Sequence, residues 1–202
     1  MEEKQLILIE GNIASGKSTI GQLLADKGYG FIPEPVSVWQ QGFDENLLDL
    51  FYSDMKRWAF TFQLAAFATR AKTWSEVLAL DDHATVFLER SIFCDRYVFA
   101  QHAFNSGLMS KTEWQIYSRM WDWLQEQYCI QPDKIIYLRT PAEICHERIA
   151  QRGRGEESSV LPRYLQALQR LHDSWLLGRR FTTAIDGTAE PDEIVGIILK
   201  TL

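Results

Sequence analysis

Residues 11–18 read Gly-Asn-Ile-Ala-Ser-Gly-Lys-Ser and fit the pattern G-x-x-x-x-G-K-[ST] at every fixed position. The octet stands between Leu6–Ile9, an apolar run of strand length, and residues 19–24, which have the composition of a helix. A strand, a glycine-rich turn and a helix in this order form a phosphate-binding loop. The glycines let successive backbone N–H groups converge on an anion, and the N-terminal end of the helix adds a positive dipole. We therefore predict that the chain binds a nucleoside triphosphate here.

Two side chains of the octet supply the groups that phosphate chemistry needs. Lys17 is expected to reach the β- and γ-phosphates, and the Ser18 hydroxyl is expected to bind Mg²⁺. We therefore expect a nucleoside triphosphate as the phosphate donor and Mg²⁺ as its metal. The residues predicted to surround the phosphates are Gly11, Asn12, Ile13, Ala14, Ser15, Gly16, Lys17, Ser18 and Thr19.

Composition narrows the class of protein. The 202 residues suit a single domain (1–202) with a sizeable core. A net charge of −6 without a long basic run argues against a nucleic-acid partner. No apolar stretch approaches a membrane span, and residues 1–5 lead directly into the first expected strand, so we expect a cytoplasmic protein. The scattered Cys94, Cys129 and Cys145 suit buried thiols in a reducing compartment.

Short apolar runs alternate with long helical stretches. The expected strands are 6–9, 30–32, 85–88, 134–138 and 183–185. Strands separated by helices favour a parallel sheet with helices on both faces. We therefore predict an α/β fold of the P-loop NTPase type, with a doubly wound five-stranded parallel sheet flanked by helices. Ligands of such sheets bind outside the carboxyl ends of the strands.

One expected helix carries an aromatic stripe. The stripe consists of Trp114, Tyr117, Trp121, Leu124 and Tyr128, with Met120 and Trp123 beside it. The steps of three and four residues place these side chains on one helix face. The stripe could pack against the sheet, or it could join two copies of the chain, because aromatic residues are enriched at interfaces. The sequence leaves both interpretations open.

Glu34 lies directly after the second expected strand, between Pro33 and Pro35. The two prolines stiffen the backbone and prevent the segment from continuing as a strand or a helix. A carboxylate held there could take a proton from an attacking hydroxyl group. The alternative is a solvated turn residue, and the sequence alone does not decide between them.

Glu89-Arg90-Ser91 follows the third expected strand. A carboxylate at a strand end that faces a phosphate loop suits a Mg²⁺ ligand, and the neighbouring arginine can neutralise charge on a transferring phosphate. A surface ion pair is the alternative, although the triplet emerges from an apolar strand.

An arginine-rich segment includes Arg148, Arg152 and Arg154, with glycines at 153 and 155. We expect a mobile, positive lid at about residues 150–160, whose arginines close over a triphosphate and exclude water. A charge cluster is usually a solvated surface, but the phosphate loop favours the lid.

Two expected helices could hold a small planar ring. Gln63, Phe67 and Arg70 fall on one face of a helix, and Asp95 shares a face of a later helix with Phe99. Glutamine can bond both a donor and an acceptor on a base edge, and aspartate accepts from exocyclic amines. The alternative is a buried ion pair between helices with ordinary core aromatics.

Together and in this order, these motifs resemble the deoxyribonucleoside kinase family, specifically its deoxycytidine/deoxyguanosine kinase branch. The resemblance covers nearly the whole chain. It is carried by residues 11–19, 33–36 with Trp39, 58–63, 89–97, 135–138, 152–157, 164–165 and 171–176. It implies a homodimeric, cytoplasmic salvage enzyme that transfers phosphate from ATP to the 5′-hydroxyl of a deoxynucleoside.

The resemblance also implies residue roles. Glu34 would be the general base, Arg90 would orient the hydroxyl and the transferring phosphate with Lys17, and Ser18 and Glu89 would serve Mg²⁺. The nucleoside would be bound by Glu34, Trp39, Tyr52, Phe62, Gln63, Arg70, Arg90, Asp95, Phe99 and Glu157. Arg148, Arg152 and Arg154 would act from the lid, and residues 186–191 would face the adenine of the donor.

Arg70 and Asp95 set the expected base preference. In the family that this chain resembles, members that accept deoxycytidine or purine deoxynucleosides carry this charged pair, and members that use thymidine lack it. We therefore expect deoxyadenosine, deoxyguanosine or deoxycytidine rather than thymidine.

Two rival functions are a nucleoside monophosphate kinase, such as thymidylate kinase, and a non-catalytic structural subunit on the same fold. An intact Lys17 and Glu34 argue against the second.

Overall fold

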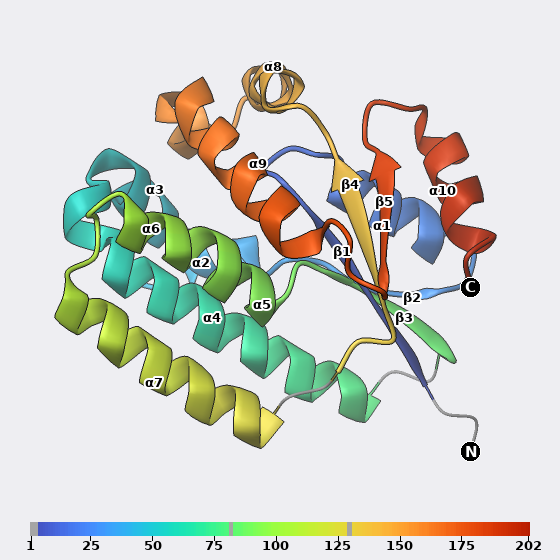
Figure 1. The fold of residues 1–202 in the computed structure, drawn as a ribbon, viewed down its shortest axis with the longest axis horizontal. Coiled ribbons are helices and arrows are strands. Elements are labelled where there is room, and N and C mark those ends of the chain that lie inside the picture. The colour runs from blue at the N-terminus through green and yellow to red at the C-terminus, as the bar shows by residue number, and fades with distance from the viewer. Residues whose placement is uncertain (1–3, 81–82, 129–130) are drawn as a thin grey trace.

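Five strands form a single sheet in the order β2-β3-β1-β4-β5 in the computed structural model, which describes residues 4–80, 83–128 and 131–202 (Figure 1). The strands are β1 (Gln5–Gly11), β2 (Gly30–Ile32), β3 (Thr85–Glu89), β4 (Lys134–Arg139) and β5 (Thr182–Asp186). All neighbouring strands run parallel. The predicted five-stranded parallel sheet is confirmed, with each expected strand inside an observed one.

Helices connect the strands. They are α1 (Lys17–Ala25), α2 (Val36–Gln41), α3 (Leu47–Ser53), α4 (Met55–Leu80), α5 (Ile92–Cys94), α6 (Gln101–Asn105), α7 (Lys111–Tyr128), α8 (Ala142–Arg152), α9 (Pro162–Leu176) and α10 (Pro191–Leu199). A π-helical segment, η1 (Asp95–Ala100), joins α5 to α6, and a 3₁₀ turn, η2 (Gly155–Ser159), follows α8. None of the helices in the described ranges is both long and apolar enough to cross a membrane.

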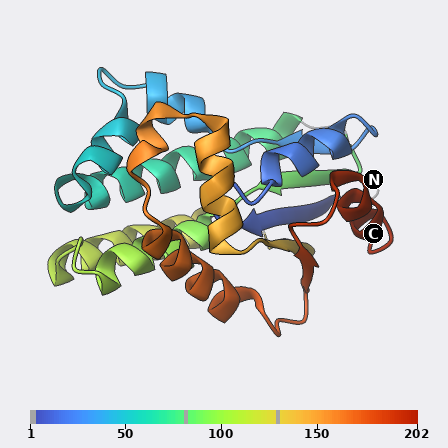
Figure 2. The ribbon, with the colours of Figure 1, turned by 90° about the horizontal axis from the view of Figure 1, so that it is seen from above.

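The central strand β1 distributes its side chains between two apolar layers. Ile7 and Ile9 pack with buried residues of α1 and α10, whereas Leu6 and Leu8 pack with buried residues of α4 and α7. Helices therefore cover both faces of the sheet, as Figures 1 and 2 show. This alternation follows from the two-residue period of a strand. It makes the sheet doubly wound.

The aromatic stripe of α7 packs on helices rather than on the sheet. Tyr117 is fully buried, and its ring lies 5.8 Å from that of Phe67 on α4. Trp121 is also buried and donates a hydrogen bond to the Ile92 carbonyl over 3.0 Å. Helix α4 thus separates α7 from the strands, which corrects the interpretation that the stripe meets the sheet directly. The Tyr128 side chain and Cys129 lie outside the described residues.

A second side of α7 faces outward. Ile116, Met120 and Trp123 are 44%, 40% and 56% exposed. They follow one another at steps of four and three residues, so they form one apolar strip along the helix.

Candidate functional site

The predicted phosphate loop connects β1 to α1, and its glycines are required by the backbone. Gly16 has a φ of 101°, in the left-handed region that favours glycine. At Gly11, an added Cβ would lie 2.6 Å from the Ser15 Oγ and 2.7 Å from the Leu138 carbonyl oxygen. Helix α1 begins at Lys17, as expected, so its N-terminal end points into the loop.

Lys17 is buried inside this loop. Its Nζ donates a hydrogen bond to the Asn12 carbonyl over 2.7 Å. Burial, together with the charge of Arg90, lowers the pKa of Lys17 to about 8. A buried amine close to a second positive charge is stabilised by an anion, so Lys17 is suited to hold a phosphate.

A cavity of about 790 Å³ opens in front of the loop. Its size is in the range of small-molecule sites. Nearly all predicted site residues line it, namely Ile13, Ala14, Ser15, Gly16, Lys17, Ser18, Thr19, Glu34, Trp39, Tyr52, Phe62, Gln63, Arg70, Glu89, Arg90, Asp95, Phe99, Arg148, Arg152, Arg154 and Glu157. Gly11 and Asn12 are not part of the lining. The Asn12 amide instead donates to the Leu165 carbonyl over 2.9 Å and ties the loop to α9.

Glu34 sits between two arginines at the wall of this cavity. Its Oε1 lies 2.9 Å from Arg70 Nη2 and 3.1 Å from Arg90 Nε. Burial alone would raise the pKa of Glu34, but the charges of Arg90, Arg70 and Lys17 outweigh burial and lower it to about 2. The carboxylate is therefore ionised at neutral pH, and it lies within electrostatic reach of Lys17.

Arg90 has an unusual backbone conformation, with a φ of 68°. Left-handed backbone at a residue other than glycine is strained and tends to occur at functional sites. The Arg90 N–H donates to the Ile9 carbonyl over 3.0 Å, and Nη1 donates to the Gly11 carbonyl over 3.1 Å. The guanidinium also lies 4.8 Å from the centre of the Phe99 ring. These contacts fix the side chain between the phosphate loop and Glu34.

Ser18 and Glu89 meet where a metal ligand pair was predicted. The Ser18 hydroxyl donates to Glu89 Oε1 over 2.7 Å, and Glu89 Oε2 accepts from the Glu34 N–H over 3.4 Å. A hydroxyl and a carboxylate oxygen are the hard ligands that Mg²⁺ prefers. The donor set therefore fits Mg²⁺ beside the phosphate loop.

The far end of the cavity offers unsatisfied polar atoms. Within the described part of the chain, Gln63 Oε1 and Arg70 Nη1 are buried without a hydrogen-bond partner. Buried polar groups are rarely left unpaired, so such atoms point to a missing ligand. Arg70 is held in place by Asp95, at 2.9 Å from Nε to Oδ2. The charged pair expected between the two helices is therefore present, and it also reaches Glu34.

Aromatic rings surround these polar atoms. The Trp39 and Phe62 rings meet edge to face at 5.5 Å, and Trp39 Nε1 donates to the Thr69 hydroxyl over 2.9 Å. Rings fixed in this way leave an apolar slot beside the Gln63 amide, which suits a planar heterocycle.

The arginine-rich segment begins within α8 and continues into η2. Arg152 and Arg154 both form ion pairs with the buried carboxylate of Glu157, the latter at 2.9 Å. Arg148 donates to the carbonyls of Ser15 and Gly187 over 3.3 and 3.1 Å. The three arginines line the cavity, but their present partners are protein groups, which the sequence did not indicate.

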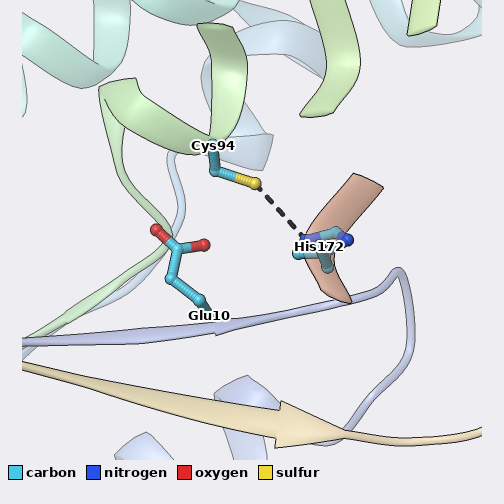
Figure 3. Close-up of side chains that lie close together, drawn as sticks. All are labelled: Glu10, Cys94 and His172. Carbon is cyan, nitrogen blue, oxygen red and sulfur yellow. Dashed lines mark hydrogen bonds between the residues drawn. The ribbon is translucent and has the colours of Figure 1, made fainter. Parts of the chain in front are cut away.

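Sequence reasoning missed a second set of buried polar residues at the carboxyl end of β1. Glu10, Cys94 and His172 come from β1, α5 and α9 and lie close together (Figure 3). All three are fully buried. One signal was available, since Glu10 is a charged residue between the apolar run Leu6–Ile9 and the phosphate loop. The partners from α5 and α9 could not be found without the fold.

Known proteins are similar to this chain over most of its length. The sequence model of the deoxynucleoside kinase family matches residues 7–193. A probable deoxycytidine kinase of fowlpox virus is 43% identical over 176 residues, which cover 87% of this chain and 73% of the viral protein. Deoxycytidine kinase 2 of Gallus gallus is 42% identical over 84% of this chain and 73% of its own length. Deoxycytidine kinase of Mus musculus is 38% identical over 89% of this chain and 78% of its own length.

Proposed function

The chain belongs to the deoxynucleoside kinase family, and we propose that it transfers the γ-phosphate of ATP to the 5′-hydroxyl of deoxycytidine or a purine deoxynucleoside. The chain is an ATP-dependent phosphotransferase of nucleotide salvage whose acceptor is an alcohol group. The observation that carries the residue assignment is Glu34, an ionised carboxylate in the same cavity as the Lys17 loop.

Glu34 is the proposed acceptor of the hydroxyl proton. The 5′-oxygen forms a bond to the γ-phosphorus while the bond from that phosphorus to the β-bridging oxygen breaks, and the hydroxyl proton passes to the Glu34 carboxylate. Phosphoryl transfer needs little bond making before the transition state, so orientation of the hydroxyl matters more than strong basicity. A carboxylate with a pKa of about 2 therefore still suffices.

Arg90 and Lys17 stabilise the negative charge of the transferring group. Arg90 is held between Glu34 and the Gly11 carbonyl, and Lys17 lies within the phosphate loop. Fixed positive charges in a buried site stabilise a developing charge without reorganisation. On binding a triphosphate, Lys17 exchanges the Asn12 carbonyl for phosphate oxygens.

Ser18 and Glu89 are the proposed holders of Mg²⁺, directly or through water. The hydroxyl and the carboxylate oxygen lie 2.7 Å apart at the N-terminal end of α1. When bound, Mg²⁺ supplies charge neutralisation on the phosphates. The adjacent Glu34 N–H holds the second oxygen of Glu89.

The base edge is proposed to bind Gln63 and Arg70. The free Oε1 of Gln63 can accept from an exocyclic amine, and the free Nη1 of Arg70 can donate to a ring acceptor. Cytosine and adenine present an amine next to a ring acceptor, whereas thymine presents a carbonyl in place of that amine and adds a methyl group. This pattern supports deoxycytidine or deoxyadenosine over thymidine.

Transfer of labelled phosphate from ATP to the four deoxynucleosides and to their monophosphates tests this function. We expect labelled 5′-monophosphates from deoxycytidine, deoxyadenosine or deoxyguanosine, and little product from thymidine. Transfer to monophosphates alone would instead identify a nucleoside monophosphate kinase. No transfer to any acceptor would leave the non-catalytic subunit as the remaining function.

We also propose a homodimer that forms through α7. The strip formed by Ile116, Met120 and Trp123 is apolar and exposed although the opposite face of the same helix is buried. Exposed apolar strips on a helix suit a second helix, and large aromatic residues are enriched at such interfaces.

A further inference from the structure

Arg90 contacts residues on two sides. Glu34 and Phe99 line the cavity with it, whereas Cys94 is fully buried and is not part of the cavity lining. Arg90 Nη1 lies 3.4 Å from the Cys94 sulfur. Cys94 in turn belongs to the buried cluster with Glu10 and His172, none of which has a role in the reaction described above (Figure 3).

The hydrogen bonds of this cluster have a defined direction. His172 Nδ1 lies 2.8 Å from the Leu168 carbonyl, which can only accept, so Nδ1 carries the proton. Burial lowers the pKa of His172 to about 3, so the ring is neutral and Nε2 is an acceptor. The Cys94 thiol lies 3.5 Å from Nε2 and donates to it. Its sulfur accepts from Arg90, which completes a chain from the guanidinium to the backbone of α9.

Glu10 fixes the backbone at the other end of the cluster. Its Oε1 accepts a hydrogen bond from the Ser91 hydroxyl, and the Ser91 oxygen accepts from the Cys94 N–H over 3.2 Å. Ser91 follows Arg90, whose φ is 68°. The Glu10 carboxylate thereby helps to hold a strained turn that carries both the arginine and the cysteine.

A metal ion is the other ligand chemistry that these residues could serve. The ligand atoms of Glu10, Cys94 and His172 all lie within 4.8 Å of one another. However, the Arg90 guanidinium lies 3.4 Å from the sulfur that would bind the ion. A cation placed there would repel this buried positive charge. The geometry therefore favours the hydrogen-bonded chain.

We propose that Cys94 and His172 are positioning residues that align the Arg90 guanidinium with the transferring phosphate. This inference rests on the proposed function, because it needs Arg90 to act on the phosphate. The hydrogen-bonded chain contacts Nη1, while Nε lies 3.1 Å from Glu34 Oε1 and the side chain lines the cavity. The thiol thus sets the direction of a catalytic side chain without touching the substrate.

Cys94→Val and Cys94→Ser test the inference, with Cys145→Val as the matched control. Valine fills the space of cysteine but removes the acceptor and the donor, whereas serine keeps both. Cys145 is equally buried, and its thiol lies 3.7 Å from the Thr140 carbonyl oxygen. We expect Cys94→Val to lower kcat about tenfold with little change in either KM, since one hydrogen bond to a charged group is lost. Cys94→Ser and Cys145→Val should stay within about threefold of the wild type.

A double-mutant cycle separates positioning from a structural effect. In an Arg90→Lys background there is no guanidinium to align, so Cys94→Val should lower kcat no further. A repeated tenfold loss in that background would overturn the inference, as would a wild-type kcat for Cys94→Val. Stoichiometric zinc in the purified protein, measured by mass spectrometry, would overturn it in favour of a metal site.

A second pair of variants serves if Cys94→Val does not fold. His172→Gln keeps a side-chain acceptor, whereas His172→Phe keeps the ring that stacks on Tyr137 at 6.0 Å but has no acceptor. We expect the phenylalanine variant to lose more kcat than the glutamine variant, and equal kcat values would overturn the inference. Failure of the proposed function gives a different result, because the wild type itself would not phosphorylate deoxynucleosides.

Discussion

Glu10→Gln should change how the stability of the protein depends on pH. Burial raises the pKa of Glu10 from 4.5 to about 7, although the Ser91 hydrogen bond and the Arg90 charge act in the opposite direction. Because the folded state holds this proton more tightly than the unfolded state, Glu10 stabilises the fold below pH 4.5. That contribution is lost as the pH rises to about 7. Glutamine stays neutral and can still accept from Ser91.

The size of the effect follows from the two pKa values. The difference between 4.5 and about 7 corresponds to about 3 kcal/mol, because one pKa unit equals about 1.4 kcal/mol. Most of this change falls between pH 5 and pH 8. Over that range the free energy of unfolding of Glu10→Gln should rise by about 2.5 kcal/mol relative to the wild type.

Urea unfolding followed by circular dichroism at pH 5, 6, 7 and 8 measures this difference. Glu147→Gln on the exposed side of α8 is the control for the loss of a carboxylate. The His172 contribution has the opposite sign, since its pKa is lowered to about 3, but it is common to both proteins and cancels. A difference between variant and wild type that does not change with pH would refute the reasoning.

Three further predictions concern ATP, the base and the dimer. The KM for ATP should rise as the pH passes about 8, the pKa of Lys17, because the neutral amine no longer attracts phosphate. Initial rates at varied ATP concentration from about pH 7 to 9.5 measure this change. Gln63→Leu should raise the KM for the deoxynucleoside about tenfold and leave the KM for ATP unchanged in steady-state kinetics, since only the base loses a hydrogen bond. Trp123→Glu should yield monomers in analytical ultracentrifugation. Phe181→Glu is the control, because Phe181 is 62% exposed and lies outside α7, and it should leave the proposed dimer intact. Dimers of both variants would contradict the α7 interface.

The sequence was sufficient for the framework of the site. The glycines and Lys17 of residues 11–18 predicted the loop. Short apolar runs separated by long helical stretches predicted the parallel sheet. A parallel sheet brings the carboxyl ends of its strands to one edge. Glu34 and Glu89, each at a strand end, were therefore expected near the loop, and the structure places both on the cavity.

The partners of the charged side chains could not be predicted in the same way. The sequence paired Arg70 with Asp95 but did not indicate that Arg70 also binds Glu34. It also did not indicate that Arg152 and Arg154 both contact Glu157, and their role toward phosphate stays a prediction. Which partner a long charged side chain contacts depends on differences of a few ångströms in the folded structure. The spacing of residues along the sequence does not determine these distances. His172 meets Cys94 across 78 positions for the same reason.

Glu34→Gln tests the central claim most directly. Glutamine has nearly the same shape but cannot take a proton from the 5′-hydroxyl, so kcat should fall on the order of 10²–10⁴-fold. The KM for ATP should change little, and circular dichroism should show an unchanged fold. A variant that phosphorylates its best deoxynucleoside at the wild-type rate would contradict the assignment of Glu34 as the base.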